Sequence, residues 1–531
     1  MSARSPSAAG HPNSRSAWPP ATTRAPPWAR GYEKPQGVAT ESLAAPWRTG
    51  AVPLPWERVL AKVQPKSEEQ EGRLPAFLRK PEGVFLALAG VFGLFFCFAT
   101  PPHDPADEDR HHGVAFLLSE AHFTVVGDAP GHEATVPRSI VNLHPRGHHY
   151  TDEQLRSGRL PADIPRTRRH RPEDLRRLYA RELAPHDRVP VRYGAAYSPL
   201  VYAAISPALA LGRAAGLPVV ASLWLARVAG LALWLAGVAL AIRRAPVGKW
   251  GLAAVALLPM SVFQAGSISG DPVSQVVLFL FFAELLRAAR RGTDWAGREA
   301  LLLVGLAALI GLVKPGYAPI TLSAVALLVA ERSGRRAAWI AAIVAAAHLT
   351  TVGWAARVQA AVQPTLAVGV DAAEQALFIA THPLEFAGIL LRTSWMSVPA
   401  WIEEMVGNVG HLDVGIPPVA TAVALLAVLA ASMLDEAPTP RPWTGWALLG
   451  GFFAAGIAIM TIAYMGWTAV GIPVIHGVQG RYFMLMLPFA LVGLPRLPTR
   501  YAPPARAAIP WALATVLAVT AVEMVDRYYE F

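Results

Sequence analysis

Long apolar blocks separated by short polar connections run through most of this 531-residue chain. From residue 84 onward the blocks are about 15–24 residues long, the length that an α-helix needs to cross a hydrocarbon core about 30 Å thick. The pattern therefore predicts about 11 membrane-spanning helices, within a range of about 10–13. The predicted spans are residues 84–100, 219–242, 250–266, 272–286, 300–313, 317–330, 337–354, 417–434, 443–465, 482–494 and 507–524.

Two further apolar segments, residues 197–211 and 383–398, are not counted as spans, because of where the basic residues lie. Cytoplasmic loops of membrane proteins carry an excess of Lys and Arg. If residues 197–211 do not cross, the basic residues gather in the cytoplasmic loops, and if they do cross, the bias inverts. We therefore expect a surface or re-entrant helix at 197–211 and place 383–398 at the outer surface. The loops assigned to the cytoplasm contain Arg243, Arg244, Lys249, Arg287, Arg290, Arg291, Arg298, Arg332, Arg335, Arg336, Arg441, Arg496, Arg500 and Arg506.

The chain is thus expected to have three parts. Residues 1–80, rich in Pro, Ser, Ala and Arg, read as a disordered cytoplasmic tail without a signal peptide. Residues 81–531 form the membrane domain, and residues 101–194 are a long extracytoplasmic loop with surface helices after the first span. The expected fold is an all-α integral membrane protein of the bacterial plasma membrane, with a cytoplasmic N-terminus and an extracytoplasmic C-terminus.

Composition supports a membrane protein. Only 16% of residues are charged, whereas soluble domains carry about 25%. The net charge of +10 comes mostly from arginines in short loops, which indicates topology and argues against nucleic-acid binding. Cys97 is the only cysteine, so no intrachain disulfide can form.

Acidic residues gather where the first predicted span ends, at Asp104, Asp107, Glu108 and Asp109. Carboxylates at a membrane interface can bind a divalent cation or take a proton from an acceptor hydroxyl. The alternative is a solvated loop that happens to be acidic, and the sequence leaves both open.

Three more charged residues lie at the predicted outer ends of spans. Asp271 is in a very short turn, where a carboxylate is costly unless it has a partner, or where it caps the next helix before Pro272. Arg481, in Gln479-Gly-Arg-Tyr482, could grip a phosphate, and Lys314 has the same potential. For both cations the alternative is contact with lipid headgroups.

Several strings resemble a bacterial membrane family known as the domain of unknown function 2142. The resemblance extends from about residue 84 to the last spans, and the order of the motifs carries it. The motifs are Asp107-Glu108-x-x-His111, Tyr197-Ser-Pro-Leu-Val-Tyr202, Arg227 in Leu225-Ala-Arg-Val228, Phe263-Gln-Ala-Gly-Ser-Ile-Ser-Gly-Asp271, Lys314 with Tyr317, Gly407-Asn-Val-Gly-His-Leu-Asp413 and Gln479-Gly-Arg-Tyr-Phe483.

That family in turn resembles GT-C-type glycosyltransferases, which use polyprenyl-phosphate sugars on the outer face. The resemblance implies that Asp107 is the catalytic base, with Glu108 as an open alternative, and that Asp271 is a second acidic site residue. It implies that a divalent cation, Mg or Mn, could be held by these three carboxylates. The lipid phosphate would be held by Arg481 and Lys314 with Tyr482 and Gln479, while His111, Tyr197 and Tyr202 would contact the acceptor or the loop.

The sequence thus favours a glycosyltransferase that moves a sugar from a polyprenyl-phosphate carrier to a glycan or lipid acceptor of the cell envelope. The alternative is a protein without enzymatic activity, such as a flippase or a scaffold for lipid-linked glycans. An enzyme requires Asp107, Asp271, Lys314 and Arg481 to converge at one place, whereas a flippase requires polar residues through the bilayer midplane.

Overall fold

The computed structural model describes residues 76–123, 134–143, 169–191, 197–292, 297–328, 334–361, 369–434 and 442–530. The chain divides into two units, residues 1–64 and 65–531, and every described residue belongs to the second. Most of the predicted tail, residues 1–75, lies outside the described residues.

Within the described residues, six helices are long and apolar enough to cross a membrane, which agrees with the expected class of helical membrane protein. They are α3 (Pro81–Ala99), α9 (Val219–Arg244), α12 (Asp271–Arg291), α14 (Gly334–Ala361), α18 (Pro442–Trp467) and α21 (Ala502–Tyr528). Helix α17 (Pro418–Ser432) is apolar but shorter. The count of about 11 spans stays a prediction.

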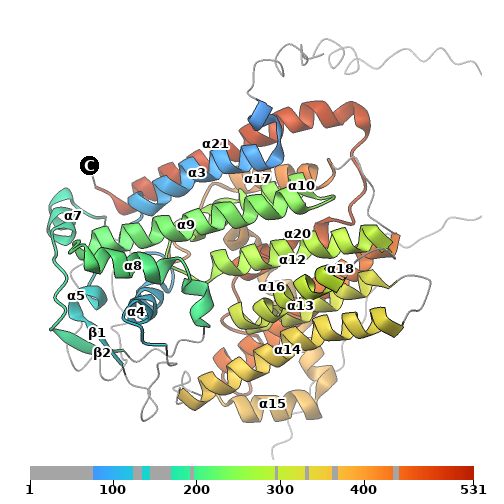
Figure 1. The fold of residues 1–531 in the computed structure, drawn as a ribbon, viewed down its shortest axis with the longest axis horizontal. Helices are drawn as coiled ribbons and strands as arrows, with labels where there is room; N and C mark the ends of the chain where they lie inside the picture. The colour runs from blue at the N-terminus through green and yellow to red at the C-terminus, as the bar shows by residue number, and fades with distance from the viewer. Residues whose placement is uncertain are drawn as a thin grey trace, which may run out of the picture. The chain divides into compact units, whose positions relative to one another are not determined.

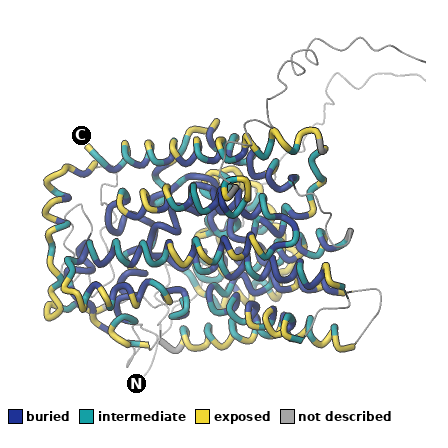
Figure 2. The backbone as a smooth tube through the Cα atoms, turned by 45° about the horizontal axis from the view of Figure 1, so that its top comes forward, coloured by how far each residue is buried: buried dark blue, intermediate teal, exposed yellow. Residues whose placement is uncertain are grey.

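Helix α12 lies at the centre of the bundle and α14 at its edge (Figure 1). The buried residues gather in the middle of the bundle (Figure 2). Of the most apolar 18 residues, 78% are buried in α12 but only 11% in α14. Most of the apolar surface of α14 therefore lies outside the packed bundle, whereas α12 is part of the protein core.

Other predicted spans are short or interrupted. Residues 250–266 form two helices, α10 (Lys249–Ala256) and α11 (Pro259–Ala265), and residues 482–494 form α19 (Arg481–Met484) and α20 (Leu487–Leu491). Both breaks precede a proline near the start of the second helix, where the missing N–H and the ring prevent continuation. Helix α13 covers Gly297–Val313, and η4 (Pro315–Leu327) is a 3-10 helix.

The segment expected to stay at the surface, residues 197–211, forms a short turn, η2 (Pro199–Tyr202), and a ten-residue helix, α8 (Ile205–Ala214). Ten residues of α-helix extend about 15 Å, half of the hydrocarbon thickness. The segment therefore does not cross as one helix. Residues 383–398 belong to α16 (Pro383–Val406), which follows α15 (Ala372–Thr381) and is not one of the six candidate spans.

The loop after α3 contains the expected helices and, in addition, a small sheet. Helices α4 (Glu108–Ser119), α5 (Arg138–Val141) and α7 (Pro172–Tyr179) accompany strands β1 (Ala134–Pro137) and β2 (Arg188–Val191). The strands pair antiparallel with Ala134 opposite Val191. The expectation of an all-α fold is corrected here: short strands rich in β-branched residues pair once the loop brings them together.

The C-terminal end of α21 lies with this loop. Tyr529 Oη donates to Ala99 O at the end of α3, over 2.6 Å, and His170 pairs with Tyr529 in a β-bridge. Arg244, the last residue of α9, pairs with Glu284 of α12, and α9 ends on the side of the bundle opposite the loop (Figure 1). The loop after α3 and the C-terminus therefore share one side of the bundle, while the assignment of that side to the cell exterior stays a prediction.

Candidate active site

Asp107 begins the site, at the turn that joins α3 to α4. It precedes the first residue of α4 with a left-handed backbone (φ 63°) and makes no side-chain cap bond to that helix. Aspartate tolerates this conformation better than most residues, although it stores some strain. The carboxylate is 45% exposed and accepts a hydrogen bond from Arg481 Nη2 at 3.1 Å. One charged group of the site is thus open to solvent.

Arg481 is the central cation and is 5% exposed. Its Nε lies 3.7 Å from Asp271 Oδ2 and has no hydrogen-bond partner among the described residues. The preceding Gly480 packs so closely on α16 that a Cβ would lie 1.9 Å from Trp401 O. Only glycine fits there, and the close contact fixes where Arg481 starts.

Asp271 and Lys314 complete the set. Lys314 Nζ donates to Asp271 Oδ1 at 3.0 Å, and both side chains are mostly buried, 16% and 8% exposed. Asp271 is the first residue of α12 and makes no cap bond, since Gly270 is the N-cap. The interpretation of Asp271 as a helix cap is therefore wrong: its carboxylate pairs with Lys314 and Arg481.

Asp107, Arg481, Asp271 and Lys314 form an alternating row of charges, which we call the charge cluster. The two carboxylates share one guanidinium, so the predicted convergence of these four residues is found in the structure. Burial raises the pKa of Asp107, but the charges of Arg481, His111 and Arg110 outweigh it and hold that pKa below its ordinary value. Asp107 is consequently ionised at neutral pH, in the form that can accept a proton.

Aromatic residues line the charge cluster. Lys314 Nζ lies 3.9 Å from the ring centre of Tyr482, and Tyr317 donates its hydroxyl to Tyr482 O at 3.0 Å. His111 Nδ1 is 2.7 Å from the Tyr202 hydroxyl, and its ring packs on Tyr197 with centres 4.9 Å apart.

The remaining expected phosphate ligand is Gln479, whose Oε1 is buried without a hydrogen-bond partner among the described residues. A buried amide oxygen and a buried guanidinium N–H without partners each cost free energy. Gln479 Oε1 and Arg481 Nε both lie in the segment 479–482. We expect this arrangement where a polar ligand binds and supplies the hydrogen bonds.

Glu108 does not belong to the charge cluster, which corrects its expected role as a base or metal ligand. Its carboxylate is fully buried and pairs with Arg227 of α9, also fully buried, at 2.8 Å (Oε1–Nε) and 2.5 Å (Oε2–Nη2). The backbone N–H groups of His103 and Ile268 donate to the same carboxylate. With four bonds accepted, Glu108 has no free position for a substrate proton.

The divalent cation expected between Asp107, Glu108 and Asp271 does not fit this arrangement. Among the described residues, no three His, Cys, Asp or Glu side chains are placed to hold a metal ion. Glu108 faces Arg227, and the guanidinium of Arg481 occupies the space between the other two carboxylates. The positive charges that contact Asp107 and Asp271 are those of Arg481 and Lys314.

Glu404, near the end of α16, is not among the site residues predicted from the sequence. Its Oε2 accepts a hydrogen bond from Gly480 N at 2.6 Å, directly beside Arg481. The sequence does show two adjacent carboxylates, Glu403 and Glu404, shortly after the apolar segment 383–398. This pair could have indicated the site. Glu404 adds a third carboxylate next to the charge cluster.

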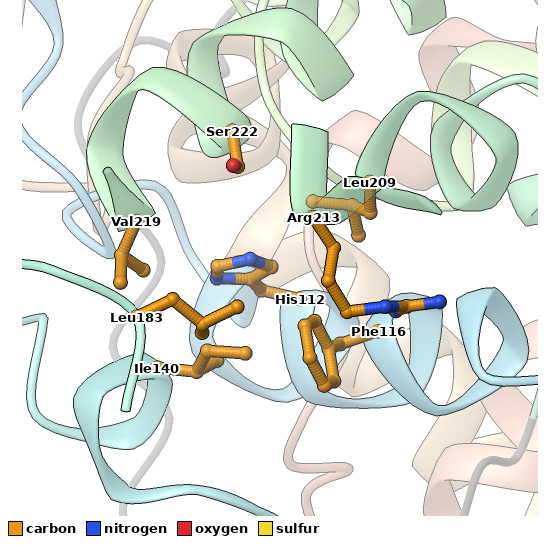
Figure 3. A pocket seen from close by; sticks show the side chains of 8 residues that line it. All are labelled: His112, Phe116, Ile140, Leu183, Leu209, Arg213, Val219 and Ser222. Atoms are coloured by element: carbon orange, nitrogen blue, oxygen red, sulfur yellow. The ribbon is translucent and has the colours of Figure 1, made fainter. Parts of the chain in front are cut away.

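A separate small cavity lies between α4, α8 and α9 (Figure 3). None of the charge cluster lines it, and His112, on its wall, is hydrogen-bonded to His103 at 3.0 Å. Its lining is mainly apolar and comprises His112, Phe116, Ile140, Leu183, Leu209, Arg213, Val219 and Ser222. The cavity therefore belongs to the packing of the loop on the bundle.

Replacing Lys314 by Met is expected to lower the free energy of unfolding by about 3 kcal/mol, because removing one partner of a buried ion pair leaves the other charge uncompensated. Asp271 would keep only the 3.7 Å contact with Arg481. Thermal unfolding in detergent measures the effect, with Lys249→Met as the matched control, because the Lys249 amine donates to Arg243 O and forms no ion pair among the described residues. Equal melting temperatures for the two variants would contradict the pairing.

Acidification is expected to destabilise the protein between about pH 6.5 and pH 4 through His111. Burial lowers the pKa of His111 from 6.5 to about 4. The unfolded chain therefore binds the proton first as the pH falls, and the folded state loses stability over that window and none above it. Melting temperatures at pH 7.5 and 5.0 should differ less for His111→Gln than for wild type, whereas exposed His382→Gln should behave like wild type.

Comparison with known proteins agrees with the resemblance seen in the sequence. Residues 91–492, more than half of the chain, match the family model described as "Predicted membrane protein (DUF2142)". All four residues of the charge cluster lie inside this range. No curated protein and no solved structure matches the chain.

Proposed function

We propose that the chain, which belongs to the DUF2142 family of predicted membrane proteins, is a GT-C-like glycosyltransferase. It transfers a sugar from a polyprenyl-phosphate carrier to a hydroxyl of a cell-envelope glycan or lipid. The reaction takes place on the outer face of the bacterial plasma membrane, with the N-terminus in the cytoplasm and the C-terminus outside.

A single observation carries the proposal: a half-buried, ionised carboxylate, Asp107, is hydrogen-bonded to a buried guanidinium, Arg481, that keeps an unused donor. A sugar-phosphate donor needs a cation for the phosphate and a base within a few ångströms of the anomeric carbon. The charge cluster supplies both. Lys314 and Tyr482 add a second cation with an aromatic wall.

In the proposed reaction the phosphate of the carrier binds to Arg481 and Lys314. The acceptor oxygen attacks the anomeric carbon as the bond from that carbon to the phosphate oxygen breaks, and the proton of the acceptor hydroxyl passes to Asp107. The lipid phosphate departs with the bonding electrons, and the two cations stabilise its charge. Direct displacement inverts the anomeric centre. Asp271 keeps both cations in place and compensates their charge before the donor binds.

The position of the site suits a lipid-borne donor. Asp271 starts α12 and Asp107 follows α3, so the charge cluster lies at the ends of two candidate spans. A phosphate at the headgroup level can reach this depth while its prenyl chain stays in the hydrocarbon. The same placement supports membrane lipid as a partner and a soluble or lipid-linked glycan as the acceptor.

Reconstitution tests the proposal. The purified protein in vesicles is given polyprenyl-phosphate-linked sugars with a labelled sugar, and release of polyprenyl phosphate together with labelled glycan is followed. Transfer that depends on the protein supports the enzyme. Movement of the labelled carrier between leaflets without transfer identifies the alternative, a flippase for lipid-linked glycans, and overturns the enzymatic proposal.

A further inference from the structure

The buried pair of Glu108 and Arg227 connects the two segments that carry the acidic residues of the site. Arg227 Nη1 donates to Cys97 O at 2.9 Å and to Thr100 O at 2.7 Å, at the C-terminal end of α3. Its Nη2 donates to Pro101 O at 3.2 Å and to Glu108 Oε2, and its Nε donates to Glu108 Oε1. All five N–H donors of the guanidinium are used.

Glu108 extends the connection in two directions. Its Oε2 accepts from His103 N at 3.0 Å, in the turn that leads to Asp107. Its Oε1 accepts from Ile268 N at 2.9 Å, in the turn that leads to Asp271. Glu108 itself is the residue next to Asp107, and its bond to Ile268 holds the chain three positions before Asp271.

The turn it holds would not keep its shape unaided. Both His103 and Asp107 have left-handed backbones, with φ 63° at each. Such conformations persist only where surrounding contacts over-determine them. The bonds to Glu108 and Arg227 hold both ends of this turn, and its middle is held by Ala106 N donating to Gly410 O and by the contact of His170 Nε2 with Asp104 Oδ2.

We infer that Glu108 and Arg227 are positioning residues. This pair, which we call the clamp, sets the distance between Asp107 and Asp271 and hence the position of Arg481 between them. This inference rests on the proposed function for its consequence in catalysis. Its structural part, the ordering of the two turns, stands independently of any activity.

The choice of variant decides whether the inference can be tested. A mostly apolar replacement of similar shape should retain the fold, because a buried ion pair removed as a whole leaves no uncompensated charge. Removing one partner alone would leave such a charge, so a single variant could fail to fold for a trivial reason. The informative variant is therefore the double replacement of Glu108→Leu with Arg227→Met.

Hydrogen exchange of the full chain in detergent gives the first readout. In the double variant, amides of residues 101–110 and 264–272 should exchange at least tenfold faster than in wild type, while the rest of the bundle is unchanged. The matched control is Glu284→Leu with Arg244→Met, which removes an ion pair at the opposite end of α9 and α12. That control should leave both turns as in wild type. Unchanged exchange in the two turns of the clamp variant overturns the inference.

The second readout is transfer in the reconstituted assay. Misplacing reacting groups by about 1 Å costs on the order of 100-fold in rate, so kcat per folded molecule should fall about that far while the KM for the donor changes little. A fall in folded protein with unchanged kcat would show a merely structural pair and overturn the positioning role. If wild type shows no transfer but the two turns loosen as expected, the glycosyltransferase proposal fails and the clamp stands.

Discussion

Replacing Asp107 by Asn is expected to reduce sugar transfer by about 10²–10⁴-fold, the contribution typical of general-base catalysis. Asparagine keeps the size of the side chain and an oxygen that can accept the bond from Arg481 Nη2. It removes the negative charge and, with it, the ability to take the proton of the acceptor hydroxyl, while Arg481 keeps its contact with Asp271. Because the Asp107 side chain is 45% exposed, folding should be little affected.

The comparison that isolates this role is Asp109→Asn, two residues further along the same acidic run. No contact joins Asp109 to Arg481 among the described residues, so its replacement should leave transfer near the wild-type rate. The measurement is initial-rate release of polyprenyl phosphate from reconstituted vesicles. In cells, a strain lacking the gene and deficient in an envelope glycan should be rescued by wild type and by Asp109→Asn. Rescue by Asp107→Asn to the same extent would remove the proposed base.

The choice among the acidic residues shows what a linear sequence cannot resolve. Asp107 and Glu108 are neighbours, and nothing in their order says which one faces the site. The left-handed backbone of Asp107 turns the chain just before α4 begins, and the adjacent carboxylates therefore point to different surroundings. Only the position of Arg227 on α9 decides that Glu108 is the buried one.

The four residues of the charge cluster could be found because charge near the bilayer is costly. Asp271, Lys314 and Arg481 each stand next to a long apolar block, where a charged group requires a partner or a function. That argument predicts that such residues meet, and they do. It says nothing of a residue like Glu404, whose neighbour in space, Gly480, is distant in the sequence.

The breaks in the helices are caused by single prolines. Mean hydropathy over a long segment does not reveal them. Pro259 and Pro488 are visible in the sequence, but a run of apolar residues scores as one span whether or not a proline interrupts it. The small sheet was missed for the opposite reason. Its strands have four residues each and lie more than 50 residues apart, so only the folded loop brings them together.

Arg481→Lys is expected to reduce transfer by about 10²–10³-fold, the loss that follows removal of one donor that stabilises a developing negative charge. Lysine keeps the positive charge between Asp107 and Asp271, so the protein should fold. It lacks the planar fork that can hold two phosphate oxygens and a carboxylate at once. The KM for the donor should rise together with the fall in kcat, because the phosphate is present in both the bound donor and the leaving group.

Donor titration in reconstituted vesicles measures both constants, and inhibition by polyprenyl phosphate reports phosphate binding separately. The matched control is Arg527→Lys, since Arg527 pairs with Asp413 at 2.6 Å near the C-terminus, outside the charge cluster. Its constants should be those of wild type. An Arg481→Lys enzyme with unchanged donor KM and unchanged product inhibition would place the phosphate elsewhere. Lys314 alone would then have to hold it, and the unpartnered Nε of Arg481 would have a purely structural cause.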